Sequence, residues 1–232
     1  MSTQNYNRIL KGFDMLRPFP FMDAVRRCIF EWPQTVGIFA DALSEGQIKS
    51  KQWLMNELEV LDLPMGTVVV CAGWYGTLSY LLLEDSKLDI ERIVSVDIDP
   101  SCEPIAEKLN LEYVVDGWRF KAVTKDIMHI DYKSDKLEMW AKGKNEFIPV
   151  TIVPDTIINT SCEHLDHFAR WYKKIPKGKL VVLQGNDLEI PEHVNRFRNL
   201  DDFESKTPMS KVLFSGELQF DMYTRFMRIG IK

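Results

Sequence analysis

The chain has 232 residues, of which 45% are hydrophobic and 27% are charged, and its net charge is -5. This length suits one large α/β core, and the mildly acidic balance disfavours nucleic acid and anionic membranes as partners. No apolar run approaches the roughly 18 residues of a membrane span, so we expect no membrane segment, no signal peptide and a cytoplasmic location.

The first 62 residues have helical patterns. Apolar residues recur at helical spacing along 47–61, and a short helix is predicted at 35–43. Residues 6–32 also have helical spacing, although prolines interrupt them. We therefore expect residues 1–62 to form a helical N-terminal extension or lid.

From residue 63 onward, short apolar runs alternate with helical segments. This alternation predicts an α/β fold with a doubly wound, mostly parallel sheet. The loops that follow the strands then lie at one edge of the sheet, where ligands bind. Strands are predicted at 67–72, 92–97, 121–125, 156–159 and 180–184, and helices at 76–84, 101–109 and 168–172.

Two segments depart from this alternation. Residues 132–154 lack a crossover helix and are predicted to form a hairpin insertion around Lys142-Gly143-Lys144. Residues 211–217 and 223–230 are strand-like and predict an antiparallel pair at the edge of the sheet. The second predicted domain is therefore 63–232, a Rossmann-like domain with an inserted hairpin.

The stretch from Val68 to Leu83 is predicted to hold a strand, a tight turn and the start of a helix. Gly73 and Gly76 allow the backbone to approach a ligand, and the helix start offers free N–H groups. Asp97 ends the second strand about 21 residues after Gly76, the spacing at which an acid binds ribose hydroxyls in nucleotide-binding folds. A solvated acid at a strand end is the alternative interpretation.

The four cysteines are Cys28, Cys71, Cys102 and Cys162, and none forms a C-x-x-C pair. Their spacing predicts neither a disulfide framework nor a metal site. Buried free thiols in a reducing compartment are expected, and no bound metal is predicted.

Taken in order, these features resemble class I S-adenosylmethionine-dependent methyltransferases over about residues 65–230. The resemblance lies in a glycine turn after the first strand, Asp97 after the second, Asp126 after the third, Pro176-Lys177-Gly178 before the fifth and the closing hairpin. It implies a doubly wound, mostly parallel sheet with an antiparallel C-terminal edge strand. It also implies S-adenosylmethionine as the cofactor.

The first loop departs from that family. The family usually has an acid followed by G-x-G-x-G, whereas Ala72, Trp74 and Gly76 stand at the three glycine positions here. Trp74 either blocks the close approach of the methionine portion or shifts the backbone so that Gly73 serves instead.

The resemblance assigns roles by position. Asp97 would bind both ribose hydroxyls and Ile98 would pack on adenine, while Asp126 would accept from the adenine amino group with Ile127 beside the ring. A helix N-cap is the alternative for Asp126. The cofactor-binding residues implied are Ala72, Gly73, Trp74, Gly76, Asp97, Ile98, Asp126, Ile127, Asn159 and Thr160.

The loop after the fourth predicted strand, 159–164, would lie beside the transferred methyl group. Asn159 would accept from the methionine amine, and Glu163 and His164 are the predicted catalytic residues, because a neutral imidazole can remove a proton near pH 7. Helix capping by this loop is the alternative interpretation.

Other loops at the same edge carry weaker signals. His193 and Arg196 are candidates for binding an anionic group, although a solvated face is the simpler interpretation. Aromatic residues of these loops are candidates for facing a sulfonium or methylated amine, with core packing as the alternative. They are Trp74, Tyr75, Trp118 and Trp140.

The sequence thus predicts an enzyme that transfers a methyl group from S-adenosylmethionine to a small-molecule or peptide acceptor. Nucleic acid is a disfavoured acceptor, because Asn159 is not followed by the proline-proline-aromatic pattern of methyltransferases that act on DNA bases. Two alternatives stay open: another reaction of S-adenosylmethionine, such as aminocarboxypropyl transfer or cleavage, and a non-enzymatic binding module. A nicotinamide dehydrogenase is disfavoured because G-x-G-x-x-G spacing is missing. The pattern does not indicate an oligomeric state.

Overall fold

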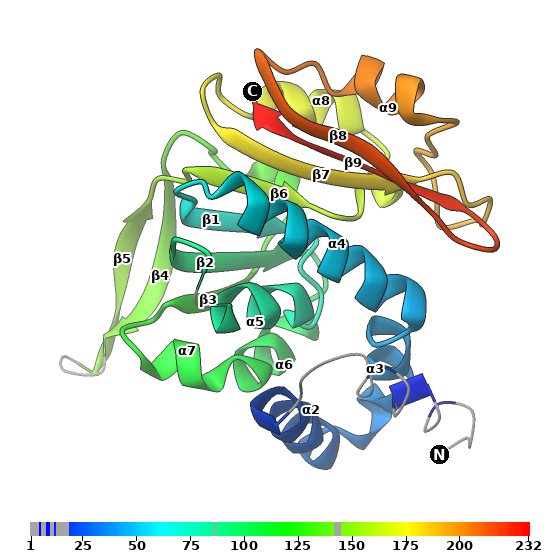
Figure 1. Cartoon of the computed structure of the whole chain (residues 1–232). Helices are drawn as coiled ribbons and strands as arrows, with labels where there is room; N and C mark the ends of the chain where they lie inside the picture. The colour runs from blue at the N-terminus through cyan, green and yellow to red at the C-terminus, as the bar shows by residue number, and fades with distance from the viewer. Residues whose placement is uncertain (1–4, 6–7, 10–11, 13–18, 86, 142–144) are drawn as a thin grey trace.

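The computed structural model describes residues 5, 8–9, 12, 19–85, 87–141 and 145–232. A seven-stranded sheet forms its centre, with helices on both faces (Figure 1). The strand order is β3-β2-β1-β6-β7-β9-β8, and every neighbouring pair up to β7 is parallel. The strands are β1 Gly66–Cys71, β2 Ile90–Asp97, β3 Phe120–Thr124, β6 Thr156–Asn159, β7 Leu180–Asn186, β8 Lys211–Gln219 and β9 Thr224–Ile231.

The C-terminal hairpin completes the sheet at one side. β9 pairs with β7 and with β8, antiparallel to both, so β8 is the outermost strand of the hairpin. The predicted fold class, a mostly parallel doubly wound sheet with an antiparallel C-terminal pair at its edge, is confirmed.

Both faces of the sheet are covered, and the strand sequences reflect this. β6 and β7 are buried along their whole length, as expected for parallel strands with helices on either side. Along β1, Val69 packs into the core under α8 and α9, whereas Val68 packs with α4 and α5. The helices are α2 Phe19–Glu31, α3 Val36–Ala42, α4 Glu45–Leu61, α5 Thr77–Glu84, α6 Cys102–Leu109, α7 Leu111–Val115, α8 Phe168–Lys174 and α9 Leu200–Lys206.

The N-terminal helices build a third apolar cluster beside the sheet. Phe21 of α2 and Phe39 of α3 are fully buried there and contact Tyr80 and Tyr75, which follow β1. Helices at 35–43 and 47–61 were predicted, and α3 and α4 confirm them. The predicted helical stretch at 6–32 is confirmed over α2, while much of its first half lies outside the described residues.

A two-stranded sheet projects from the opposite end (Figure 1). β4 Asp135–Ala141 pairs antiparallel with β5 Glu146–Ile152, and Leu137 and Ile152 pack onto the core. The pair matches the predicted hairpin, although its predicted turn at 142–144 lies outside the described residues. Neither α7 nor α9 was predicted. Among the described residues, no helix combines the length and apolar character needed to cross a membrane.

Candidate functional site

The loop after β1 keeps the backbone conformation of a glycine turn with two glycines replaced. Ala72, Trp74 and Gly76 have φ angles of 52°, 51° and 73°, which is the left-handed region. A residue with a side chain loses roughly 1–2 kcal/mol there. The three positions that the resemblance aligned with glycines therefore share the glycine conformation, and Ala72 and Trp74 adopt it under strain.

The two glycines of this loop allow close packing. A Cβ atom on Gly73 would lie 1.9 Å from the Ser95 hydroxyl, while the Gly73 N–H donates to the Val96 carbonyl at 3.0 Å. Gly76 precedes α5, and the Asn110 amide donates to its carbonyl at 3.2 Å. Gly76 thus positions the helix and, unlike Ala72 and Gly73, does not line the cavity described next.

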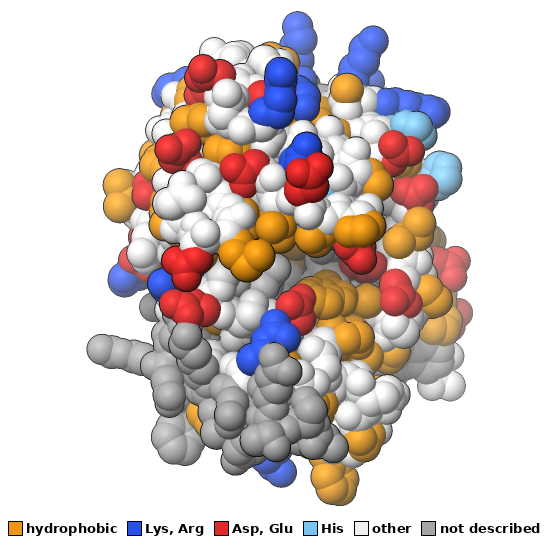
Figure 2. All heavy atoms as spheres, turned by 90° about the vertical axis from the view of Figure 1, so that its right-hand side faces the viewer, with side chains coloured by type: hydrophobic (Ala, Val, Ile, Leu, Met, Phe, Trp, Pro, Cys, Tyr) orange, Lys and Arg blue, Asp and Glu red, His pale blue; other side chains and the backbone are white. Residues whose placement is uncertain are grey.

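A hollow lies at the carboxyl edge of the parallel strands, on the face shown in Figure 2. It consists of two adjoining cavities of about 380 and 280 Å³, which share Ala72, Asp97, Ser161 and His164 as lining residues. Their combined size falls in the range of cofactor pockets. Nine of the ten predicted cofactor-binding residues line these two cavities, and Gly76 is the exception.

The smaller cavity brings together the residues predicted to hold adenine. Ile98, just after β2, is 69% exposed, and Ile127, just after β3, is buried. Asp126 also lines this cavity while its carboxylate accepts from the Met128 N–H at 2.7 Å, so it caps the turn Ile127–His129 as the alternative interpretation required. Its second oxygen, Oδ2, lies 3.5 Å from the Nδ1 of the exposed His129.

Asn159 lies at the inner wall of the same cavity. Its side chain is buried, its Oδ1 accepts from the Ser161 N–H at 2.9 Å, and its Nδ2 has no hydrogen-bond partner among the residues that the structure describes. An unpaired buried donor is costly and favours a ligand that accepts a hydrogen bond. Asn159 thus offers a donor, whereas its predicted role was to accept from an amine.

Asp97 lies between the two cavities. One carboxylate oxygen accepts from the Trp74 N–H at 2.8 Å, and the other accepts from the Asp99 N–H at 3.0 Å. These bonds fix the carboxylate and leave further lone pairs for donors from a ligand. The strained conformation of Trp74 therefore serves to orient Asp97.

The Trp74 side chain does not close the cavity. It is half-buried against the apolar cluster of the N-terminal helices, with its ring 6.0 Å from that of Tyr75, and it forms part of the wall of the larger cavity. Of the other aromatic candidates, Tyr75 is buried against Phe39, and Trp118 lies under the Arg92 guanidinium at 4.2 Å. The side chain of Trp140 lies outside the described residues.

The larger cavity receives a lysine that the sequence analysis missed. Lys51 of α4 lines it and is 8% exposed, and its Nζ donates to the Gln47 Oε1 at 2.7 Å. Burial, followed by the charge of Arg225, lowers the pKa of Lys51 to about 7. No carboxylate within the described part of the chain forms an ion pair with it. The helical periodicity of α4 could have predicted that Lys51 is buried, because Lys51 lies on the same helix face as Leu54 and Leu58.

The predicted catalytic pair is divided between the surface and the interior of the site. His164 lines both cavities. Glu163 is 2% exposed beneath it, where its Oε1 accepts from the Asn186 amide and lies 3.7 Å from Arg225. Arg225 also donates to the Thr160 carbonyl at 3.1 Å. The carboxylate therefore belongs to a buried network below the cavity wall.

The structure also places three further sets of predicted residues. Thr160 lines the larger cavity, and its contact with a cofactor stays a prediction. Arg196 instead pairs with the exposed Glu189 at 2.8 Å, as the solvated alternative required. All four cysteines are buried and unpaired, in agreement with the prediction of free thiols.

No family model and no curated protein matches this sequence. The structure is similar to magnesium protoporphyrin IX methyltransferase from Synechocystis PCC 6803 with bound SAH, with a TM-score of 0.54 and 13% identity over 80% of this chain and 84% of that one. It is also similar to the [4+2]-cyclase SpnF, with a TM-score of 0.52 and 10% identity over 79% of this chain and 80% of that one. The methyltransferase HEN1, which acts on small RNA, is similar with a TM-score of 0.54 and 15% identity over 79% of this chain and 25% of the HEN1 chain. The chain therefore has the fold of the class I S-adenosylmethionine-dependent methyltransferases.

Proposed function

We propose that this protein binds S-adenosylmethionine and transfers its methyl group to a small-molecule or peptide acceptor. The observation that carries the proposal is the chemical order along the cavity. Apolar and acidic side chains line one end, a carboxylate lies in the middle, and a buried cation borders the other end. An aromatic base, a ribose diol and an amino-acid carboxylate follow one another in the same order in S-adenosylmethionine.

At the first end, Ile98 and Ile127 provide apolar surfaces for the faces of an adenine ring. Ile98 is exposed in the free protein, so covering it with a ring removes apolar area from water. Asp126 Oδ2, whose neighbour His129 is exposed, would accept from the adenine amino group, and Asp97 would accept from the two ribose hydroxyls.

At the other end, Lys51 is proposed to bind the methionine carboxylate. Asp41 lines the same cavity and raises the pKa of Lys51, but Asp41 is paired with Arg8 and the burial of Lys51 outweighs it. A ligand carboxylate would add the charge compensation that the buried ammonium lacks. Ala72 and Gly73 would face the same portion of the cofactor. We infer that Lys51 takes up a proton when the cofactor binds near or above pH 7.

The methyl group would then lie near the loop after β6. Its transfer needs an aligned acceptor whose lone pair attacks the methyl carbon while the C–S bond electrons return to sulfur. His164 is the predicted catalytic residue that lines the cavity, and we propose that it faces the acceptor. Glu163, held by Asn186 and Arg225, would position this loop from below and would not itself exchange protons with the acceptor.

Calorimetric titration with S-adenosylmethionine and S-adenosylhomocysteine tests the cofactor. We expect micromolar binding of both, weakened at least tenfold by Asp97→Ala and by Lys51→Met. Asp99→Ala is the matched control, because this exposed acid lies on the same loop but outside the cavity. Absence of binding by the unaltered protein would contradict the proposal.

The products then identify the reaction. Methyl transfer yields S-adenosylhomocysteine and an acceptor heavier by one methylene unit, which mass spectrometry detects. Formation of methylthioadenosine would instead support cleavage or aminocarboxypropyl transfer. Binding without any product across a panel of acceptors would favour the non-enzymatic alternative.

A further inference from the structure

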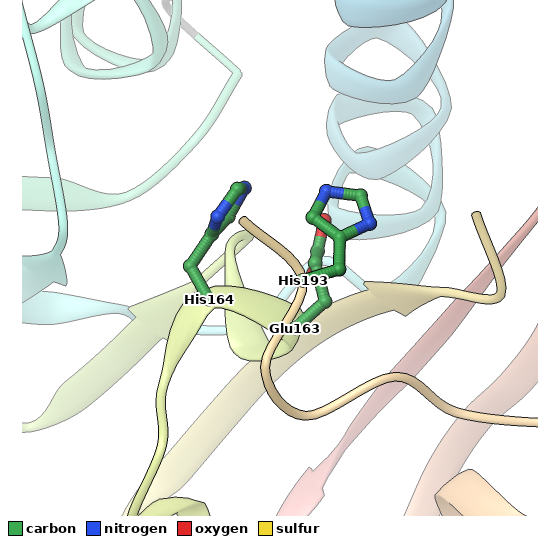
Figure 3. A group of neighbouring side chains, drawn as sticks. All are labelled: Glu163, His164 and His193. Atoms are coloured by element: carbon green, nitrogen blue, oxygen red, sulfur yellow. The ribbon is translucent and has the colours of Figure 1, made fainter. Parts of the chain in front are cut away.

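Glu163, His164 and His193 form a cluster beside the cavity (Figure 3). Glu163 and His164 belong to the turn Cys162–His164 after β6, and His193 belongs to the loop after β7. One ligand atom from each residue lies within 4.8 Å of the other two. The two imidazole rings approach edge to face, with centroids 4.6 Å apart.

Hydrogen bonds to the main chain orient both imidazoles. The Nδ1 of His164 lies 3.1 Å from the Glu192 carbonyl oxygen, and the Nδ1 of His193 lies 2.8 Å from the Leu188 carbonyl oxygen. A carbonyl oxygen only accepts, so each Nδ1 carries the proton. This leaves Nε2 of each ring as the nitrogen that can bind a metal, an arrangement typical of metal-binding histidines.

Glu163 contributes an unsatisfied oxygen to the cluster. Its side chain is nine-tenths or more buried, and its Oε1 is held by Asn186 and Arg225. Its Oε2 is buried without a hydrogen-bond partner among the described residues. A buried carboxylate oxygen in this state is costly, and a cation bound to it would remove that cost.

We propose that Glu163 Oε2, His164 Nε2 and His193 Nε2 bind one divalent first-row transition metal ion. Two nitrogen ligands and one carboxylate with open positions suit such an ion. Ligands bound at about 2.1 Å lie at most about 4.2 Å apart, so small side-chain rotations close the site.

The ion would border the cavity, because His164 lines its wall. Its open positions would take an acceptor that carries a hydroxyl or carboxylate oxygen, and it would lower the pKa of a coordinated hydroxyl. This use of the ion rests on the proposed function, whereas the binding of the ion does not. It also gives His164 the role of a ligand that holds the acceptor through the metal.

Cobalt(II) titration of the chelator-treated protein tests the site, with calorimetry and visible absorption as readouts. We expect one equivalent of Co²⁺ to bind, and His193→Ala and Glu163→Gln to weaken binding at least tenfold. His167→Ala is the matched control, since this exposed histidine of the same segment lies outside the cluster. Unchanged affinity in His193→Ala, or no binding to the unaltered protein, would overturn the proposal.

Two further measurements keep the outcome clear. Circular dichroism establishes that each variant is folded. If Glu163→Gln fails to fold, Co²⁺ binding is measured in His193→Gln instead, because His193 is a half-buried loop residue whose replacement disturbs the fold less. S-adenosylmethionine binding is measured separately in the metal-free protein. Co²⁺ binding without cofactor binding would overturn the proposed function alone, whereas cofactor binding without Co²⁺ binding would overturn the metal site alone.

Discussion

The two ends of the cavity are built in different ways. The end proposed for adenine is made by residues at or just after the ends of β2 and β3, namely Asp97, Ile98, Asp126 and Ile127. The opposite end draws Lys51 from a helix before the sheet and rests on Glu163 and Arg225 from distant parts of the chain. The order of the strands positions the residues of the first end, whereas burial and charge compensation position Lys51, Glu163 and Arg225 at the second end. The predictions below test this difference.

The largest expected effect lies beneath the second end. Arg225→Met leaves Glu163 buried without its cation, so the free energy of unfolding should fall by about 3–5 kcal/mol. Urea denaturation measures the loss. The control is Arg196→Met, which replaces a partly exposed arginine and should change the free energy of unfolding little. Adding Glu163→Gln to Arg225→Met should recover part of the lost stability. If Arg225→Met were as stable as Arg196→Met, Arg225 would not compensate the buried charge of Glu163.

At the first end, the main effect should fall on cofactor binding. Asp97→Ala removes an acceptor for two ribose hydroxyls, and we expect about 1.5–3 kcal/mol weaker cofactor binding by calorimetry. Asp97→Asn, which keeps the shape and one acceptor oxygen, should retain part of the affinity. If Asp97→Ala bound the cofactor as the unaltered protein does, the carboxylate would serve only to fix Trp74.

Lys51 should link stability to pH. Its pKa is about 7 in the folded protein against 10.5 normally, so the unfolded chain binds more protons between these values. Stability should therefore rise with pH across this window, and Lys51→Met should raise the melting temperature at pH 7 and flatten the dependence. Thermal melts from pH 6 to 10 measure both, with Lys49→Met, an exposed residue paired with Glu45, as the control.

The same lysine should make cofactor binding depend on pH. If the methionine carboxylate raises the pKa of Lys51, affinity should be highest below pH 7 and fall as pH rises above it. Calorimetry in buffers of different ionisation enthalpy should reveal proton uptake near pH 8. Lys51→Met should abolish that uptake.

The smallest expected effect concerns the first loop. Ala72→Gly relieves a left-handed alanine, although glycine is favoured more in the unfolded chain, so a gain of about 0.5–1 kcal/mol is expected. Ala169→Gly, on the exposed side of α8, should instead lose about 1 kcal/mol. Chemical denaturation of the two variants separates backbone strain from ordinary helix propensity.

Sequence patterns predicted the sheet and its ligand-binding edge because both depend on local periodicity and strand order. The hairpin insertion and the closing strand pair were visible for the same reason. Lys51 was missed because its significance depends on burial, which the pattern of α4 showed only through its apolar neighbours. No metal site was predicted because His193 lies 29 positions after His164, and only the loop after β7 brings the two rings together.

The position of β9 has a consequence for the order in which the molecule is completed. β9 follows β8 in the chain, yet it lies inside the sheet between β7 and β8 and carries Arg225. A chain emerging from the ribosome therefore has an open β7 edge and an uncompensated Glu163 until β9 has emerged. Emergence of β9 should be the event that both covers the β7 edge and completes the floor of the cavity, so a truncation before Thr224 should expose the chain to chaperones and proteases.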